Sequence, residues 1–310
     1  MNPRLWTVLL TLASAFAAEN CDRKPTVQPG DTLASLADYY FADTNYGYAI
    51  LIATNRRAGQ EGFRYIGDPF HLPPGAPLCI PGLDEAHRLK NRNQTYVRAV
   101  DAMSLPQPWE VSDKLVSVDP HKPVTVVSWM RPDEVERLKS GAKWITQSPA
   151  DLWITIAPQV RNFCKQFRAE HGDDPEQLDL RLEQRLGMPP ASGKRFFVEI
   201  VIADPSSRAN LFRPCAVPDV NSTACPIGPP PASVDVTHRS WFYTQYYRSY
   251  GQARPSPYPW TSLGYTFDWA PRAREIGDME FIKHGESEFV VPKGAVIEIK
   301  SVTPTPAYCK

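Results

Sequence analysis

The sequence predicts an α+β protein, with a small N-terminal module followed by a larger, mainly antiparallel β-rich domain that contains disulfides. Residues 25–82 hold two amphipathic segments between two strand-like ends, and residues 95–310 hold several apolar runs of strand length with few helix signals. The 310-residue chain also has 32 prolines. That is roughly twice the usual ~5% share and favours strands, turns and ordered loops over a helical bundle.

Residues 1–18 have the features of a secretory signal peptide. Arg4 is the only early charge, and the apolar run from Leu5 to Ala18 is too short to span a bilayer. The run ends in Ala15-Phe16-Ala17, a small-residue pattern that signal peptidases accept. No later segment is apolar enough to cross a membrane. We therefore expect a periplasmic or secreted mature chain with no transmembrane segment after signal cleavage.

The six cysteines all follow the signal segment, and an even number in a secreted chain indicates about three disulfides. One expected pair lies beside the two strands that the small module must bring together, a second flanks a short proline-containing loop, and the third joins the remaining cysteines. Spacing alone leaves other connectivities open. The expected pairs are Cys21 with Cys79, Cys215 with Cys225, and Cys164 with Cys309. No Cys-x-x-Cys motif occurs, which argues against redox or zinc chemistry.

The small module, residues 19–82, has a strand–helix–helix–strand order. Pro25–Gln28 and Leu78–Ile80 are the expected strands at its two ends. Pro29-Gly30 turns the first strand into the first helix, and Pro73-Pro74-Gly75 turns the chain into the second strand. The two strands are expected to pair while both helices cover one face of the ribbon.

Both helices of this module have recognisable boundaries. Asp31 or Thr32 can cap the first helix through a side-chain oxygen. Apolar residues then recur at i, i+3, i+4 and i+7, on one helical face. These residues are Leu33, Leu36, Ala37 and Tyr40. A second helix is expected from about Tyr46 to Thr54, with Asn55 as the left-handed residue that ends it.

The stretch resembles a LysM domain. Val27-Gln28-Pro29-Gly30-Asp31-Thr32-Leu33 is similar to the opening of that family, Pro74-Gly75-Ala76-Pro77-Leu78-Cys79-Ile80-Pro81 is similar to its close, and Asn55 falls where the family commonly has asparagine. The resemblance implies binding of N-acetylglucosamine-containing polymers, chiefly peptidoglycan and less so chitin, in a shallow groove between loops 30–33 and 66–72. The segment from Arg56 to Tyr65 is longer and more basic than in compact members of the family.

The resemblance also implies a set of glycan-binding residues in these two loops. They are Gly30, Asp31, Thr32, Leu33, Ile66, Asp68 and Phe70. Backbone amides would grip the acetamido group, an aspartate would reach sugar hydroxyls, and Phe63, Tyr65 or Phe70 would offer an apolar face. The alternative is structural: Asp31 would only cap a helix, and Asp68-Pro69 would only make a turn.

Residues 83–94 form a polar connector in this interpretation, and residues 95–310 form the larger α+β domain. Short apolar runs predict its strands. They are Tyr96–Ala99, Leu115–Val118, Val124–Trp129, Phe196–Ile202 and Gly264–Trp269. Two further runs, Glu288–Val291 and Ala295–Val302, are expected to pair as a hairpin around Pro292-Lys293-Gly294.

Two helices of the larger domain are marked by their ends. Pro132–Lys139 has proline in its first turn, acidic residues after it, and Gly141 just past its end. Asp174-Pro175-Glu176-Gln177 resembles a capping box. The leucine stripe that follows it is Leu178, Leu182 and Leu186, which predicts an amphipathic helix that ends at Gly187.

Aromatic residues crowd the segment from residue 241 to residue 269. They are Trp241, Phe242, Tyr243, Tyr246, Tyr247, Tyr250, Tyr258, Trp260, Tyr265, Phe267 and Trp269. Aromatic faces stack on sugar rings and peptides, so a binding platform is one interpretation. Core packing is the favoured one, because aromatic side chains bury the largest apolar areas and half of these alternate as buried strand residues do.

No catalytic motif stands out. The sequence has no nucleophile elbow, zinc-protease helix, P-loop or dinucleotide fingerprint, and its charges balance, with 34 basic and 34 acidic residues. We therefore expect no metal, no cofactor and no nucleic-acid partner. The candidates for acid–base work are His121, His238, His284, Glu199, Asp268 and Glu286. Three glutamates could supply the paired carboxylates of glycoside hydrolysis: Glu280, Glu286 and Glu288. Carboxylates this close in sequence more often form one solvated face.

Three functions fit these patterns. The first is a non-enzymatic periplasmic or secreted protein that docks on cell-wall glycan through the module and presents the larger domain to an envelope protein partner. The second is a cell-wall hydrolase with its catalytic domain at residues 95–310, held near its polymer by the module. The third is a structural module that binds no sugar.

Overall fold

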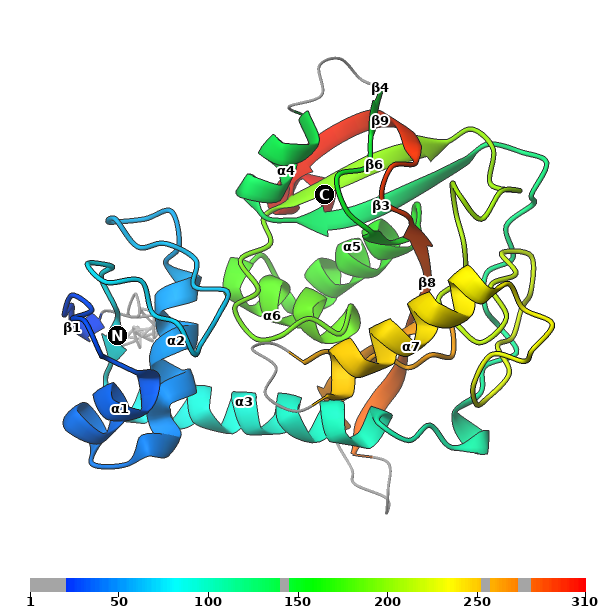
Figure 1. Ribbon diagram of the computed structural model, residues 1–310. Coiled ribbons are helices and arrows are strands. Elements are labelled where there is room, and N and C mark those ends of the chain that lie inside the picture. Colours follow the sequence, from blue (N-terminus) through cyan, green and yellow to red (C-terminus); the bar gives the residue numbers. More distant parts are fainter. Residues whose placement is uncertain (1–20, 140–144, 252–256, 273–279) are drawn as a thin grey trace, which may run out of the picture.

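The computed structural model describes residues 21–139, 145–251, 257–272 and 280–310; the predicted signal peptide lies outside these ranges. The chain folds into helices, a small two-stranded sheet and a seven-stranded antiparallel sheet, with three disulfides. Figure 1 shows a small N-terminal module at one end of a long helix and the large sheet with its helices at the other. The α+β prediction is confirmed.

The N-terminal module is residues 21–82. Strand β1 (Cys21–Arg23) pairs antiparallel with β2 (Ile80–Pro81), and helices α1 (Leu33–Phe41) and α2 (Gly47–Arg56) lie between them, joined by the 3-10 turn η1 (Thr44–Tyr46). The expected strand at residues 25–28 is reduced to a single bridge between Thr26 and Pro77. Backbone hydrogen bonds flank this bridge, from Val27 N to Ala76 O at 2.9 Å and from Leu78 N to Pro25 O at 2.8 Å, so the two ends of the module still pair there over a short length.

The residues that the sequence predicts to begin and end the helices of the module do so, with the exception of Asn55. Thr32 caps α1, since its side-chain oxygen accepts a hydrogen bond from Ser35 N at 3.0 Å. The interpretation of Asn55 as a left-handed helix end is wrong. Asn55 stays within α2 and is buried, and its amide group donates to Ile66 O at 3.0 Å and accepts from Ile66 N at 2.8 Å. It fixes the loop after α2.

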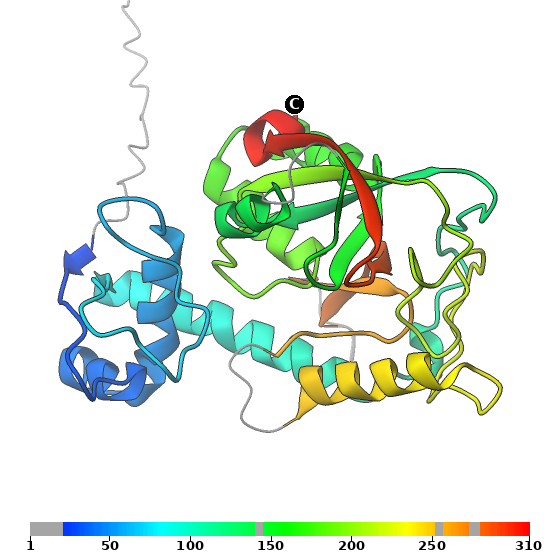
Figure 2. The same ribbon diagram turned by 45° about the horizontal axis from the view of Figure 1, so that its top comes forward.

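The predicted strand at residues 96–99 is wrong, and the residues of the predicted polar connector, 83–94, are helical. Both belong to one helix, α3 (Leu83–Met103), which has Asp84 and Glu85 in its first turn, where the helix dipole favours acidic residues. Its N-terminal half contributes Ala86 and Leu89 to the core of the module. Its C-terminal half packs in the core of the larger domain. Figures 1 and 2 show α3 running from the module beneath that domain.

The large sheet has the strand order β4-β9-β6-β3-β5-β8-β7, and every neighbouring pair is antiparallel. Its strands are β3 (Val124–Met130), β4 (Ile145–Gln147), β5 (Leu152–Ile156), β6 (Phe196–Ile202), β7 (Tyr265–Pro271), β8 (Phe281–Val291) and β9 (Val296–Pro304). The predicted strand at residues 115–118 is not part of it. That segment is extended, but it bonds irregularly to residues 220 and 223 and to the Ser287 hydroxyl.

The expected hairpin between β8 and β9 is also wrong. Four residues join them, yet β8 pairs with β5 and β7 while β9 pairs with β4 and β6. Strands four places apart in a flat sheet would lie about 19 Å from each other. The link contains a tight turn in which Ala295 N donates to Pro292 O at 3.1 Å, which is too compact for that span. The sheet must therefore curl until β8 and β9 approach each other.

Helices pack on both faces of this curled sheet. They are α4 (Pro132–Lys139), α5 (Gln159–His171), α6 (Pro175–Arg185), α7 (Val236–Tyr250) and the short α8 (Thr305–Tyr308), with a 3-10 turn η2 (Pro108–Glu110) after α3. The face that α5 and α6 cover presents Val127 and Phe197 to Leu182, and α4 packs on the opposite face. The predictions for α4 and α6 are confirmed, and Asp174 caps α6 by accepting from Glu176 N at 2.9 Å.

The segment Arg56–Tyr65 packs the module against the larger domain. Arg56 forms ion pairs with Glu85 of α3 at 2.9 Å and with Glu176 of α6 at 2.7 Å. Arg131 lies over the ring of Tyr65, 4.8 Å from its centroid. A Cβ atom at Gly193 would come within 2.9 Å of that ring, so a glycine permits the close contact. The extra length of this segment therefore has a structural use.

The three disulfides join the expected partners. Cys21 bonds to Cys79 within the module, Cys215 bonds to Cys225 across a loop, and Cys164 of α5 bonds to Cys309 after α8. All six cysteines are therefore oxidised, as is usual for proteins from oxidising compartments. In the part of the chain that the structure describes, no helix has the length and apolar character needed to cross a membrane.

Candidate functional site

The two loops that the sequence singles out in the module both contact α2. The backbone and Cβ of Leu33 lie 3.1 Å from where a Cβ on Gly47, the first residue of α2, would be. Near the end of α2, the side chain of Asn55 forms two hydrogen bonds with the backbone of Ile66. Burial, and then the charge of Asp68, raise the pKa of Tyr48. Loops 30–33 and 66–72 are therefore both anchored on α2, although they are more than 30 residues apart in the sequence.

Most of the predicted glycan-binding residues hold these loops in shape. Gly30 has a φ of +92°, which a residue with a side chain rarely adopts, and the Asp31 carboxylate accepts from Gln28 N at 2.7 Å. The Asp68 carboxylate accepts from Phe70 N at 2.9 Å and contacts His71 Nδ1 at 2.7 Å. These bonds, the one to Phe70 first, lower the pKa of Asp68. Thr32, as described, caps α1.

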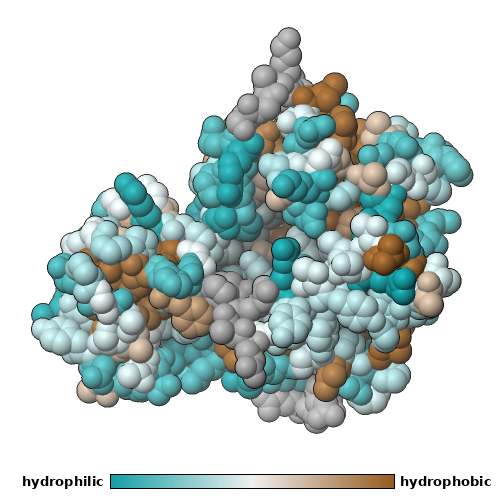
Figure 3. Space-filling view, viewed as in Figure 1, coloured by the Kyte–Doolittle hydropathy of each residue, from teal (hydrophilic) through white to brown (hydrophobic). Residues whose placement is uncertain are grey.

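Of the predicted apolar contacts, only Phe70 lies open to solvent. Its side chain is 57% exposed, whereas Phe63 is 2% exposed in the core of the module, and Tyr65 packs on Arg131. Leu33 and Ile66 are also buried in that core. The surface that this region offers to a ligand therefore consists of loop backbone, aspartate oxygens and the Phe70 ring. Figure 3 shows apolar surface on the module, interrupted by polar patches.

The carboxylates proposed for acid–base work are each in an ion pair with arginine, and two of them, Asp268 and Glu286, share Arg185. Asp268 is fully buried and bonds to Arg181 at 2.6 Å. Glu199 bonds to Arg161 at 2.9 Å, and Glu286 bonds to Arg185 at 2.8 Å. Glu280 pairs with Arg98 on the surface. No cluster of carboxylates, histidines and cysteines able to hold a metal ion is found among the described residues.

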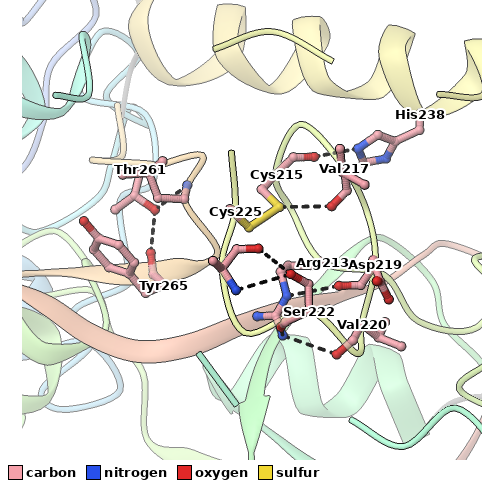
Figure 4. The surroundings of a disulfide bond; sticks show 12 residues. Arg213, Cys215, Val217, Asp219, Val220, Ser222, Cys225, His238, Thr261 and Tyr265 are labelled. Carbon is pink, nitrogen blue, oxygen red and sulfur yellow. Dashed lines mark hydrogen bonds between the residues drawn. A yellow bond between two sulfur atoms is a disulfide. The ribbon is translucent and has the colours of Figure 1, made fainter. Parts of the chain in front are cut away.

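The histidines are dispersed, and His238 has a structural role. Figure 4 shows it beside the Cys215–Cys225 disulfide, where Nε2 lies 2.8 Å from Cys215 O. Burial lowers its pKa, which favours the neutral ring. The buried Arg213 in the same view bonds to several loop carbonyls, with Nη2 at 2.6 Å from Val116 O. His284 contacts Glu110 O at 3.2 Å, and His121 is exposed.

The larger domain contains a cavity of about 550 Å³ that no sequence motif indicates. It lies where β3 and β5 separate. These strands pair only through Val126 and Val127, so continued register would place Trp129 opposite Trp153. That pair does not form, and the Ser128 hydroxyl instead donates to Trp153 O at 3.0 Å. The open edges of the two strands line part of the cavity.

Most of the cavity wall is apolar and aromatic. The residues that line it include Trp129, Trp153, Phe197, Tyr258, Trp260 and Phe267. Trp260 is 5% exposed, and its indole N–H is buried without a hydrogen-bond partner in the described chain. Gln245 and Arg248 of α7 lie at one side of the cavity, and Glu134, Arg137 and Lys194 lie at another.

Glu288 of β8 is the distinctive polar group of this cavity. It stands opposite Thr155 of β5 in the sheet, and both residues line the cavity. Within the described ranges its carboxyl group has no hydrogen bond or ion pair. Desolvation by burial raises its pKa to about 8, so the group holds its proton at neutral pH. The sequence suggested Glu288 as one of several carboxylates for glycoside hydrolysis or as part of a solvated acidic face; its place in the cavity depends on pairing between β5 and β8, which has no signal in the sequence.

The aromatic segment 241–269 divides between core and surface. Phe242, Trp260, Tyr265, Phe267 and Trp269 are buried. Tyr243, Tyr246, Tyr247 and Tyr258 have exposed fractions of 38–73%. Trp241 of α7 packs against Trp153 and Trp260, with ring centroids 6.0 Å from each. The prediction of core packing therefore holds for the aromatic residues of β7. Three tyrosines of α7 are instead exposed: Tyr243, Tyr246 and Tyr247.

Comparison with known proteins adds no family. A scan of the chain against protein-family models gives no match, and searches of curated proteins and of solved structures give none either. Function must therefore be argued from the two regions described above, the loops of the module and the cavity of the larger domain.

Proposed function

We propose that the protein is a non-enzymatic extracytoplasmic protein that binds N-acetylglucosamine-containing glycan, peptidoglycan in the first place, through residues 21–82. The observation that carries this proposal is that loops 30–33 and 66–72 are both anchored on α2, the first at Gly47 and the second through Asn55. The motifs of the LysM resemblance and the residues it implies lie in and beside these loops. Three disulfides agree with a protein outside the cytoplasm.

The chemistry of the loops suits a sugar with an acetamido group. The Asp31 carboxylate bonds to the backbone N–H of Gln28, and Asp68 makes an Asx turn to Phe70 N. Both hold the backbone in one conformation, so amide groups are already oriented when a ligand arrives. Phe70 offers an exposed ring to the apolar face of a sugar. The larger domain, fixed to the module through α3 and Arg56, would then be presented to an envelope partner.

A hydrolase is the weaker candidate. Glycoside hydrolysis commonly uses two carboxyl groups about 5 to 9.5 Å apart. Among the carboxylates that the sequence offered for this reaction, Glu280 and Glu286 are each paired with an arginine, and Glu288 lines the cavity. Two further carboxylates line the cavity, but both have partners. Glu134 is paired with Arg131 and Lys194, and Asp151 accepts hydrogen bonds from Trp241 Nε1 and Lys293 N.

The test is retention of the mature protein on insoluble peptidoglycan and on chitin. We expect retention of the wild-type protein, and a loss of about tenfold in affinity for Phe70→Ala, which removes an exposed ring without disturbing the core. Tyr39→Ala is the matched control, because Tyr39 is 80% exposed on the same module but lies two turns beyond Thr32 along α1. Wild-type protein that stays in the supernatant of both polymers would overturn the proposal. Released muropeptides would instead support the hydrolase.

A further inference from the structure

We propose that the cavity between β3, β5 and β8 is a second ligand site, which takes a neutral N-acetylated sugar of one or two rings and pairs its amide with the carboxyl group of Glu288. The choice of an N-acetylated sugar rests on the proposed function of the module. The existence of an amide-binding site rests only on the cavity.

Size and walls agree with such a ligand. A volume of about 550 Å³ falls within the usual range of about 300 to 1,000 Å³ for small-molecule sites. Trp129, Trp153, Tyr258 and Trp260 line it, and aromatic faces stack well on the C–H faces of sugar rings. The cavity opens at a break in the sheet, so Trp129 and Trp153 are held on β3 and β5, while Tyr258 and Trp260 come from the irregular segment before β7.

Glu288 decides the chemistry of the ligand. A protonated carboxyl group has one O–H donor and one carbonyl acceptor side by side. An amide has the complementary arrangement, with a carbonyl acceptor and an N–H donor, so the two groups can form a pair of hydrogen bonds. A carboxylate ligand would gain less, since it could accept the O–H of Glu288 but has no N–H to offer the carbonyl oxygen. Among the residues that the structure describes, neither the Glu288 carboxyl group nor the buried Trp260 indole N–H has a hydrogen-bond partner, and both residues line the cavity.

Other ionisable groups surround Glu288 and must be distinguished from it. They are Arg248 and Tyr250 of α7, Tyr258, Asp151, Lys194, and Glu134 and Arg137 of α4. Burial raises the pKa of Tyr250 and of Tyr258, so both stay neutral below pH 9. Lys194 is paired with Glu134 at 2.6 Å, and burial lowers its pKa. A Glu288→Gln variant separates the titration of Glu288 from all of these.

Tryptophan fluorescence separates this site from the module. Residues 19–82 contain no tryptophan, whereas Trp129, Trp153 and Trp260 line the cavity. The experiment titrates the mature protein with N,N′-diacetylchitobiose and, as the matched ligand without an amide, with cellobiose. We expect a fluorescence change with diacetylchitobiose, at least tenfold weaker binding of cellobiose, and about a tenfold loss of affinity for diacetylchitobiose from pH 7 to pH 9 as Glu288 ionises.

The variants make the proposal falsifiable. Glu288→Ala should lose at least tenfold in affinity. Glu288→Gln, whose amide still donates and accepts, should keep the affinity and lose the pH dependence. Glu298→Gln, an exposed carboxylate on β9, is the control and should match wild type. No fluorescence or calorimetric response to diacetylchitobiose, equal binding of cellobiose, or unchanged pH dependence in Glu288→Gln would each overturn the proposal. Phe70→Ala should leave this titration unchanged while it lowers polymer retention, so either proposal can fail alone.

Discussion

The loops of the module and the cavity of the larger domain are built in opposite ways. The loops use residues close in sequence, whose polar groups are satisfied by neighbours two or three positions away, as at Asp31 and Asp68. The cavity brings together residues from Val127 to Glu288, and its distinctive carboxyl group has no partner among the described residues. Loops whose polar groups already have hydrogen bonds keep their shape without a ligand and discriminate weakly between ligands. A desolvated polar group without a hydrogen bond lowers the stability of the fold, and a ligand that supplies the missing bond is selected strongly.

Helix α3 connects these two regions, and breaking it should give the largest effect. Gln94 is exposed near the middle of the helix, between the half that packs in the module and the half that packs under the sheet. We expect Gln94→Pro to cost about 3 kcal/mol or more, because proline removes a helical hydrogen bond and clashes with the preceding turn. Calorimetry should then show two unfolding transitions in place of one. Gln94→Ala is the control, and a single unshifted transition in Gln94→Pro would show that α3 does not couple the two cores.

The second prediction concerns the stability of the larger domain against pH. The pKa of Glu288 is about 8 in the folded protein and near 4.5 when the chain is unfolded. Between these values the folded state holds a proton that the unfolded state has released. The free energy of unfolding should therefore fall as pH rises from about 4.5 to about 8, and then level off. The upper limit is about 1.4 kcal/mol per pH unit, or about 5 kcal/mol over this range. We expect a smaller contribution, on the order of 2 kcal/mol, because Glu288 is partly accessible to solvent.

Glu288→Gln should remove that contribution. Burial also raises the pKa of Glu183 to about 7 and that of Asp179 to about 6, which gives slopes of the same sign. The difference between wild type and Glu288→Gln in chemical denaturation at pH 5, 7 and 9 isolates Glu288. Parallel curves for the two proteins would contradict the assignment of a protonated Glu288.

The smallest effect is expected where the module docks on the larger domain. Arg56→Ala removes ion pairs to Glu85 and Glu176, of which Glu85 is largely buried, and should cost about 1 kcal/mol. Arg88→Ala is the matched control, since Arg88 also pairs with Glu85 but is 62% exposed. Exposed ion pairs contribute little, so Arg88→Ala should change the midpoint of denaturation hardly at all. Equal losses in both variants would mean that Arg56 has no special docking role.

Where the signals were local, the sequence predicted the structure well. Thr32 at the start of α1, Pro132 and the acidic residues of α4, and Asp174 before α6 are caps that act within one turn. The misses were of two kinds. The many polar residues on the exposed side of α3 made the segment look like a connector, although apolar residues line its other side. The short turn at Pro292-Lys293-Gly294 predicted a hairpin, but the curled sheet lets the same turn join two strands that do not pair with each other. For the site, the loops of the module came from sequence motifs, and the cavity did not.

The sequence by itself determined the helix caps and the α+β class, because these depend on short-range backbone chemistry and on residue type. Only the tertiary structure decided which cysteine connectivity forms, that α3 joins two cores, that β8 and β9 pair with different strands, and that Glu288 lines a cavity with no partner among the described residues. Those features depend on strand pairing between distant segments and on desolvation, and neither has a local signal in the chain.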